Sequence, residues 1–192
     1  MTANNKKTSN RADADGVLEA VRIRTEEVRA ERRGWRRWLI GTVLVCLILF
    51  LLLRVFFPLA VVEGTSMYPA FRDSDLVIFT RLYGELKRGD VVLAETDNGT
   101  VLIKRIAGLP GEEVYIDERT SSVFIDGEEL KEEGIQGRTE GGDELEYPFT
   151  LGENEYFLLG DNREVSIDSR AYGPMSAEQI KGKVWLTVRV GG

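Results

Sequence analysis

A run of sixteen residues without a charge, from Trp38 to Leu53, most constrains how this chain can fold. A bilayer core of about 30 Å needs about 20 helical residues. The run reaches that length at Phe57 if Arg54, near one end, extends its charged group to the interface. The alternative is a buried core helix, but the remaining chain is too short to surround a helix that is apolar on all sides. The sequence therefore predicts one transmembrane helix over residues 38–57.

The charges beside this helix predict its direction. Five arginines crowd its N-terminal side, namely Arg29, Arg32, Arg33, Arg36 and Arg37. Because basic residues are enriched on the cytoplasmic side of a span, we expect residues 1–37 in the cytoplasm and residues 58–192 outside. The charged region is too long, and the apolar core longer than about 7–15 residues, for a cleavable signal peptide. We therefore expect an uncleaved, single-pass anchor in the cell membrane.

Composition narrows the function of the external part. Residues 1–57 hold 11 Lys/Arg and 6 Asp/Glu, a net charge of +5, whereas residues 58–192 hold 14 and 26, a net charge of −12. An acidic domain argues against nucleic acid as a partner, because phosphate is bound mainly by basic residues. With one cysteine, Cys46, and no histidine, neither an internal disulfide nor a cysteine-based metal site is possible. We expect no metal and no cofactor.

Beyond residue 60 the pattern is that of short strands. Apolar runs bounded by Gly, Asp or Asn lie at 76–79, 91–94, 101–106, 113–116 and 156–159, and residues 184–190 alternate as a half-buried strand should. Asp126-Gly127 is a hairpin signal, and residues 131–146 are typical of an exposed loop or hairpin. The pattern predicts a mostly-β domain of bent antiparallel sheets in a barrel-like arrangement. Helices are suggested only at 176–182 and in residues 13–34, after a disordered stretch at 1–12.

Two side chains could together carry chemistry. Ser66 lies in a Gly/Pro-framed loop, EGTSMYPAF, soon after the anchor, and a serine needs a base to become a nucleophile. Lys104 lies in the middle of the apolar run VLIKRI, where burial would lower its pKa and make the neutral amine a competent base. A lysine that reaches solvent at a sheet edge is the alternative.

A polar segment near the C-terminus could support such a pair. In GDNREVSIDSRAYG, residues 160–173, the first three residues suit a tight turn. Asp168 and Arg170 are candidates for an ion pair with a scaffolding role. The hydroxyl of Ser166 is suited to orient the lone pair of a buried lysine amine.

Four segments carry a resemblance to a known family. SMYPAF, RGDVVL, KRIAGLPGE and GDNREVSIDSR occur in the order and approximate spacing of the type I signal peptidases. The chain resembles this family from its anchor to near its C-terminus, in the shorter form common in Gram-positive bacteria. The resemblance implies a mostly-β, Ser/Lys protease core with a variable β region, which maps onto residues 112–155.

The resemblance also implies roles for single residues. Ser66 would be the nucleophile, Lys104 its general base and Ser166 the partner of the lysine, above a salt-bridged support of Asp168, Arg170 and Arg105. The oxyanion hole would use the N–H of the nucleophile, while the position that carries a hydroxyl donor in some members is Gly64, whose backbone could fill the gap. By position, the walls of the substrate pockets would be Val62, Phe71 and Ile103.

The leading hypothesis is therefore a membrane-bound serine endopeptidase that removes signal peptides from secretory preproteins at the outer face of the membrane. A dedicated peptidase of the same clan, acting on one pilin or conjugation protein, is a second hypothesis. A catalytically silent, membrane-tethered β domain that binds preproteins is a third. Against the third, Ser66, Lys104 and the last motif are all present. The sequence leaves the oligomeric state open.

Overall fold

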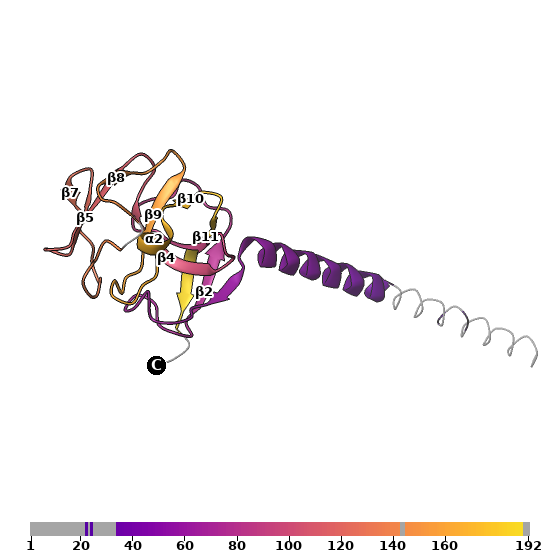
Figure 1. Cartoon of the computed structure of the whole chain (residues 1–192). Helices are drawn as coiled ribbons and strands as arrows, with labels where there is room; N and C mark the ends of the chain where they lie inside the picture. Colours follow the sequence, from indigo (N-terminus) through magenta and orange to yellow (C-terminus); the bar gives the residue numbers. More distant parts are fainter. Residues whose placement is uncertain (1–21, 23, 25–33, 143–144, 190–192) are drawn as a thin grey trace, which may run out of the picture. The chain divides into compact units, whose positions relative to one another are not determined.

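The computed structural model describes residues 22, 24, 34–142 and 145–189 (Figure 1). Predictions for residues 1–12, and most of those for residues 13–34, lie outside the described residues. The described elements include twelve with their own labels: β1 (Leu59–Val61), β2 (Leu76–Thr80), β3 (Val91–Glu95), β4 (Val101–Gly108), β5 (Glu113–Asp117), β6 (Ser122–Ile125), β7 (Glu128–Glu129), β8 (Phe149–Thr150), β9 (Glu155–Leu159), α2 (Ser169–Tyr172), β10 (Met175–Ser176) and β11 (Ile180–Val188).

The chain divides into two units, Met1–Leu52 and Leu53–Gly192. A helix over Gly34–Phe56 is long and apolar enough to cross a membrane, and its apolar side chains are exposed all round. The helix begins four residues before the start of the predicted span, 38–57, and ends one residue before the end of that span. This is the pattern of a helix that has lipid as its solvent.

The larger of the two sheets has seven strands in the order β1-β2-β11-β3-β4-β9-β10, and every pair is antiparallel. The C-terminal strand β11 thus lies between β2 and β3, where Figure 1 shows it in yellow. The mostly-β prediction is confirmed. Within the described ranges no pairing joins β1 to β10, so a closed barrel is not seen.

The smaller sheet has the order β7-β6-β5-β8 and belongs to the segment expected to be the variable region. Its hairpin turn uses Asp126 and Gly127 at φ 52° and 78°, the left-handed conformation that a two-residue turn of this kind requires. Side chains from both sheets share one core, in which Phe157 and Leu159 of β9 pack with residues of β5 and β6, such as Val114 and Val123. This core fixes the small sheet against the large one.

The helix suggested at 176–182 is not present. Ser176 ends β10, the chain makes one turn, and Ile180 begins β11. The Gln179 side chain does accept a hydrogen bond from the Ser176 N–H at 2.8 Å, as in a capping box. The local signal therefore formed a single turn, because the alternating apolar residues after it form the interior strand β11.

Candidate active site

The loop between β1 and β2 positions Ser66. The side chain after it, Met67, is almost fully buried and packs with Val62, Phe71 and Val77. The N–H of Phe71 donates to the carbonyl oxygen of Met67 at 2.8 Å, which closes a tight turn. A buried anchor on one side and a turn on the other hold the serine hydroxyl away from this core.

Lys104 lies in the centre of strand β4, with β3 on one side and β9 on the other. Its side chain is 3% exposed, so it does not snorkel to the sheet edge. The Lys104 Nζ donates to the Ser66 Oγ at 2.7 Å. The strand and the loop therefore bring together two residues that are 38 positions apart in the sequence.

Burial governs the charge of this lysine. Desolvation lowers the pKa of Lys104 from 10.5 to about 8; the negative charges of Asp168 and Asp161 oppose the shift, and the positive charge of Arg170 adds to it. No carboxylate lies within ion-pair distance of the ammonium in the described part of the chain. The amine can thus lose its proton close to neutral pH.

Two ion pairs lie in the segment that follows β9. Arg170 donates to both carboxylate oxygens of Asp168, at 2.8 and 2.9 Å, and both side chains are buried. Arg105 was expected in the same cluster, but it pairs instead with Asp161, at 2.8 and 2.6 Å. The sequence had suggested only a turn for Asp161, because nothing local shows that β4 and β9 are neighbours.

Asp168 has a second task. It is the N-cap of α2, where its side chain accepts from the Arg170 N–H, and it also accepts from the Gly160 N–H at 2.9 Å. One carboxylate thus caps the helix, pairs with the arginine and fixes the Gly160 backbone.

Ser166 does not hydrogen-bond to Lys104 in this structure. Its Oγ is buried and has no partner among the residues described. The side chain lies beside Gly160, where an added Cβ would come within 2.1 Å of that Oγ and 2.6 Å of the Ser66 carbonyl oxygen. The Ser166 side chain and the Ser66 carbonyl oxygen therefore both lie against Gly160, where no side chain would fit.

Gly64 and Phe71 lie differently from what the family resemblance implies. The Gly64 N–H donates to the Asp73 Oδ1 at 2.7 Å, so it does not supply a free second oxyanion donor. The Ser66 N–H, by contrast, donates to no acceptor in the described ranges. Phe71 is buried in the core behind the loop and does not line the groove at Ser66.

A groove of about 460 Å³ opens at the serine–lysine pair. Val62 and Ile103 line it, as expected, together with Ala60, Val61, Glu63, Ser66, Met67, Leu93, Thr100, Val101, Leu102 and Lys104. Its two sides are the segment 60–63, from the end of β1 into the Ser66 loop, and the first half of β4. Among the described residues, no group of three or more acidic or cysteine side chains is arranged to hold a metal ion.

One apolar helix ahead of a β domain with a serine–lysine pair is the make-up of a membrane-anchored hydrolase. A sequence model of the family "Signal peptidase, peptidase S26" matches residues 35–188. The signal peptidase I of Bacillus licheniformis is 32% identical over 82% of this chain and 91% of its own length. The signal peptidase IB of Staphylococcus aureus is 28% identical over 77% and 85%.

A crystal structure of a signal peptidase I from Enterococcus faecalis is 27% identical, with a TM-score of 0.43 over 52% of this chain and 97% of that one. The family model and the Bacillus relative are sufficient for assignment. The chain belongs to the signal peptidase family, peptidase S26, and is a serine endopeptidase of the signal peptidase I type.

Proposed function

We propose that this chain removes N-terminal signal peptides from secretory preproteins, with Ser66 as the nucleophile and Lys104 as its general base. The observation that carries the proposal is the 2.7 Å hydrogen bond between the Lys104 Nζ and the Ser66 Oγ, made by a lysine that is buried and has a lowered pKa. A neutral amine at that distance accepts the serine proton directly.

The reaction proceeds by acyl transfer. The Ser66 Oγ attacks the scissile carbonyl carbon as its proton moves to the Lys104 Nζ, and the carbonyl oxygen becomes an oxyanion near the uncommitted Ser66 N–H. The Lys104 ammonium then protonates the amine of the mature chain, which leaves. Water, deprotonated by Lys104, hydrolyses the acyl-serine and releases the signal peptide.

Ser166, Asp168, Arg170 and Arg105 support this chemistry. A buried hydroxyl without a partner costs about 1–3 kcal/mol, so the Ser166 Oγ is suited to a hydrogen bond that forms only when the Lys104 amine turns toward substrate. The ion pairs Arg105–Asp161 and Arg170–Asp168 fix the backbone on either side of Ser166 in the sequence.

The groove beside Ser66 would select the residues that precede the cleavage site in the substrate. Val62 and Ile103 line the groove together with Ser66, and we infer that they restrict the residues before the cut to small side chains. The extended end of a signal peptide would lie between the segment 60–63 and the first half of β4. The substrate and the enzyme would then share one bilayer, which raises their encounter frequency.

We also propose that residues 1–37 are cytoplasmic and that the β domain acts at the outer face of the lipid bilayer, without nucleic acid as a partner. The basic residues before Trp38 support this direction. Added protease that digests the β domain in intact spheroplasts, and leaves an N-terminal tag intact, would agree with it. Digestion of the tag alone would indicate the opposite orientation.

The experiment for the proposed function is cleavage of a purified preprotein in lipid vesicles by the wild type, Ser66→Ala and Lys104→Ala. We expect a single cut after a small residue by the wild type and a loss of at least a thousandfold in both variants. A wild type that binds the preprotein without cutting it would support a silent binding domain. Cleavage of one pilin-like substrate alone would support the dedicated peptidase.

A further inference from the structure

Residues 131–142, here called the strap, join β7 to the region before β8 and belong to the segment 131–146 that was predicted as an exposed loop or hairpin. In the structure the strap lies against residues 160–170, which follow β9. Its Gln136 N–H donates to the Asp161 carbonyl oxygen, and the Gln136 carbonyl oxygen accepts from the Arg163 N–H, both at 2.8 Å. These two bonds form a short parallel bridge between the strap and the turn after β9.

The side chain of Arg163 is the strongest link between the two segments. It is 3% exposed, and its guanidinium donates to the Thr139 Oγ1 and the Gly160 carbonyl oxygen, both at 3.0 Å, and to the carboxylate of Glu132. Two of the three acceptors belong to the strap. Glu132 supplies the only carboxylate that pairs with this buried cation in the described part of the chain.

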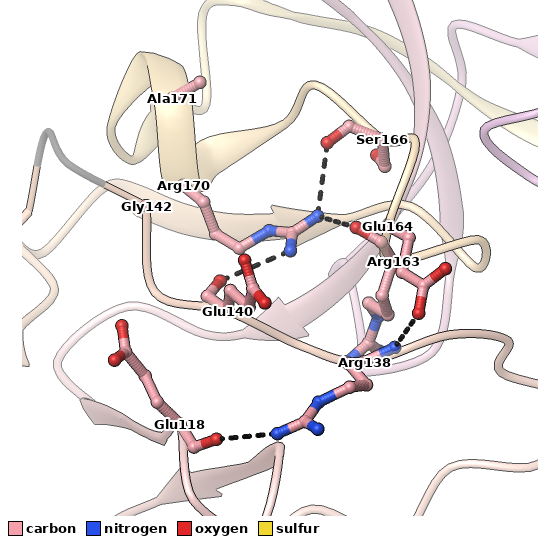
Figure 2. Close-up of a pocket in the computed structure, with 9 residues that line it drawn as sticks. All are labelled: Glu118, Arg138, Glu140, Gly142, Arg163, Glu164, Ser166, Arg170 and Ala171. Atoms are coloured by element: carbon pink, nitrogen blue, oxygen red, sulfur yellow. Dashed lines mark hydrogen bonds between the residues drawn. The ribbon is translucent and has the colours of Figure 1, made fainter.

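Further contacts hold the strap along its length. Figure 2 shows Arg170 reaching the Glu140 carbonyl oxygen, with 3.3 Å between the atoms, and the Glu164 carboxylate accepting from the Arg138 N–H at 3.2 Å. Arg170 also donates to the Arg163 carbonyl oxygen at 2.7 Å, which links the two arginines. Between these contacts a cavity of about 590 Å³ remains open.

The turn that Arg163 fixes is also the turn that holds the nucleophile. The Asn162 N–H donates to the Ser66 carbonyl oxygen at 2.9 Å, and the Asn162 Nδ2 donates to the Thr65 carbonyl oxygen at 3.3 Å. A chain of contacts therefore runs from Glu132 through Arg163 and the turn 160–163 to the main chain of Ser66. An ion pair begins it, the covalent backbone of the turn continues it, and a hydrogen bond ends it at Ser66.

We propose that Glu132 is a positioning residue for Ser66, and that the strap is part of the catalytic machinery. The inference rests on the proposed function. Loss of the Glu132 carboxylate leaves the Arg163 guanidinium buried without its counter-ion, so the guanidinium moves toward water and releases the Gly160 carbonyl oxygen. The turn then shifts, and the Ser66 Oγ leaves its place opposite Lys104. Substrate binding in the groove is unaffected, because the strap does not line the groove.

The test compares Glu132→Ala and Glu132→Gln with Glu133→Gln in the full chain, in detergent, on the same preprotein. Glu133 is the matched control: it is an exposed neighbour of the same charge, without a hydrogen bond or ion pair in the described ranges. We expect kcat to fall about 10- to 100-fold in Glu132→Ala, with KM within twofold of wild type. Glu132→Gln, which keeps an acceptor oxygen, should lie between this variant and the wild type, and Glu133→Gln should equal the wild type.

Two readouts separate positioning from a merely structural role. Activity is measured well below the melting temperature of each variant and divided by the folded fraction, so that loss of stability alone leaves kcat unchanged. The midpoint of the pH profile should stay at the wild-type value, because the strap does not contact Lys104. A folded Glu132→Ala variant with wild-type kcat would overturn the proposal. So would a variant in which kcat/KM falls only because KM rises.

If Glu132→Ala does not fold, Thr139→Val tests the same link, since it removes the hydroxyl acceptor and keeps the shape. A two- to fivefold lower kcat at unchanged KM is expected, and an unchanged kcat would count against the strap. Failure of the proposed function is seen separately, as a wild type that does not cut or a Ser66→Ala chain that still does.

Discussion

Four cations lie around this site, and their surroundings sort them into two kinds. Arg105, Arg163 and Arg170 each pair with a carboxylate, from Asp161, Glu132 and Asp168 respectively. Lys104, which is as buried as Arg163, pairs with no carboxylate among the described residues and donates to the neutral hydroxyl of Ser66. The arginines therefore keep their charge and hold the backbone, whereas the lysine has an ammonium that burial destabilises.

The comparison shows how one small domain makes both a scaffold and a base from basic side chains. An ion pair with bidentate geometry fixes the position of the guanidinium and of the backbone next to it. A lysine without a counter-ion has a lowered pKa, which is what a base at neutral pH needs.

The largest effect is expected at a paired cation. Asp168→Ala leaves the Arg170 guanidinium buried without its carboxylate and removes the cap of α2, so the free energy of unfolding should fall by about 3–5 kcal/mol. Chemical unfolding of the full chain in detergent measures this. Lys181→Ala, which breaks the exposed pair with Glu95, is the control and should cost at most about 1 kcal/mol. Equal losses in the two variants would remove the distinction between buried and exposed pairs.

Replacing the unpaired cation, Lys104, should raise the free energy of unfolding at pH 7 instead of lowering it. In the wild type, the unfolded state binds a proton at Lys104 up to pH 10.5, but the folded state only up to about pH 8. Below pH 8 this difference costs the folded state up to about 3 kcal/mol, and the cost fades as the pH rises from 8 to 10.5. Lys104→Met should therefore be inactive but more stable at pH 7, with an advantage that shrinks above pH 8. A less stable Met variant at pH 7 would show that the lysine is not destabilised by burial.

The same lowered pKa predicts the pH dependence of catalysis. The active form has neutral Lys104, so kcat/KM should rise tenfold per pH unit below about pH 8 and level off above it, a gain of roughly fiftyfold between pH 6 and pH 8. A peptide substrate without groups that titrate in this range gives the profile. A flat profile, or full activity of Lys104→Arg at neutral pH, would exclude a neutral amine as the base.

The smallest effect concerns the contact between the scaffold and the reacting pair. Gly160→Ala places a methyl group against the Ser166 Oγ and the Ser66 carbonyl oxygen, so we expect a loss of about 1–3 kcal/mol in stability and a lower kcat. Thermal unfolding and turnover of the same preparation measure both. Gly84→Ala, whose Cβ would meet nothing within 4 Å, should change neither value. If both variants behave alike, the close approach at Gly160 is without consequence.

Much of the fold could be predicted because its signals are local. Apolar runs gave β2, β3, β4, β5 and β9 to within one or two residues, and Asp126-Gly127 gave the turn between β6 and β7. The seven-stranded order could not be predicted, because it depends on which strands meet. The capping signal at Ser176 was overridden by the strand after it.

The candidate site divides in the same way. The pairing of Ser66 with Lys104 followed from one apolar run and one loop, together with the family resemblance. The partner of Arg105 did not, since Asp161 reaches it only because β4 and β9 are adjacent. The burial of Phe71 behind the loop, the use of the Gly64 N–H by Asp73, and the link from Glu132 to Arg163 are likewise tertiary contacts without a sequence signal.

Strand β11 joins two parts of the large sheet that would otherwise be separate. Residues 180–188 are synthesised after every other described strand, yet they fill the gap between β2, which follows the Ser66 loop, and β3, which pairs with the Lys104 strand. A growing chain that has not yet delivered these residues holds the two halves of its reacting pair on separate pieces of sheet. We therefore expect the contact between Ser66 and Lys104 to form only once β11 is in place between β2 and β3.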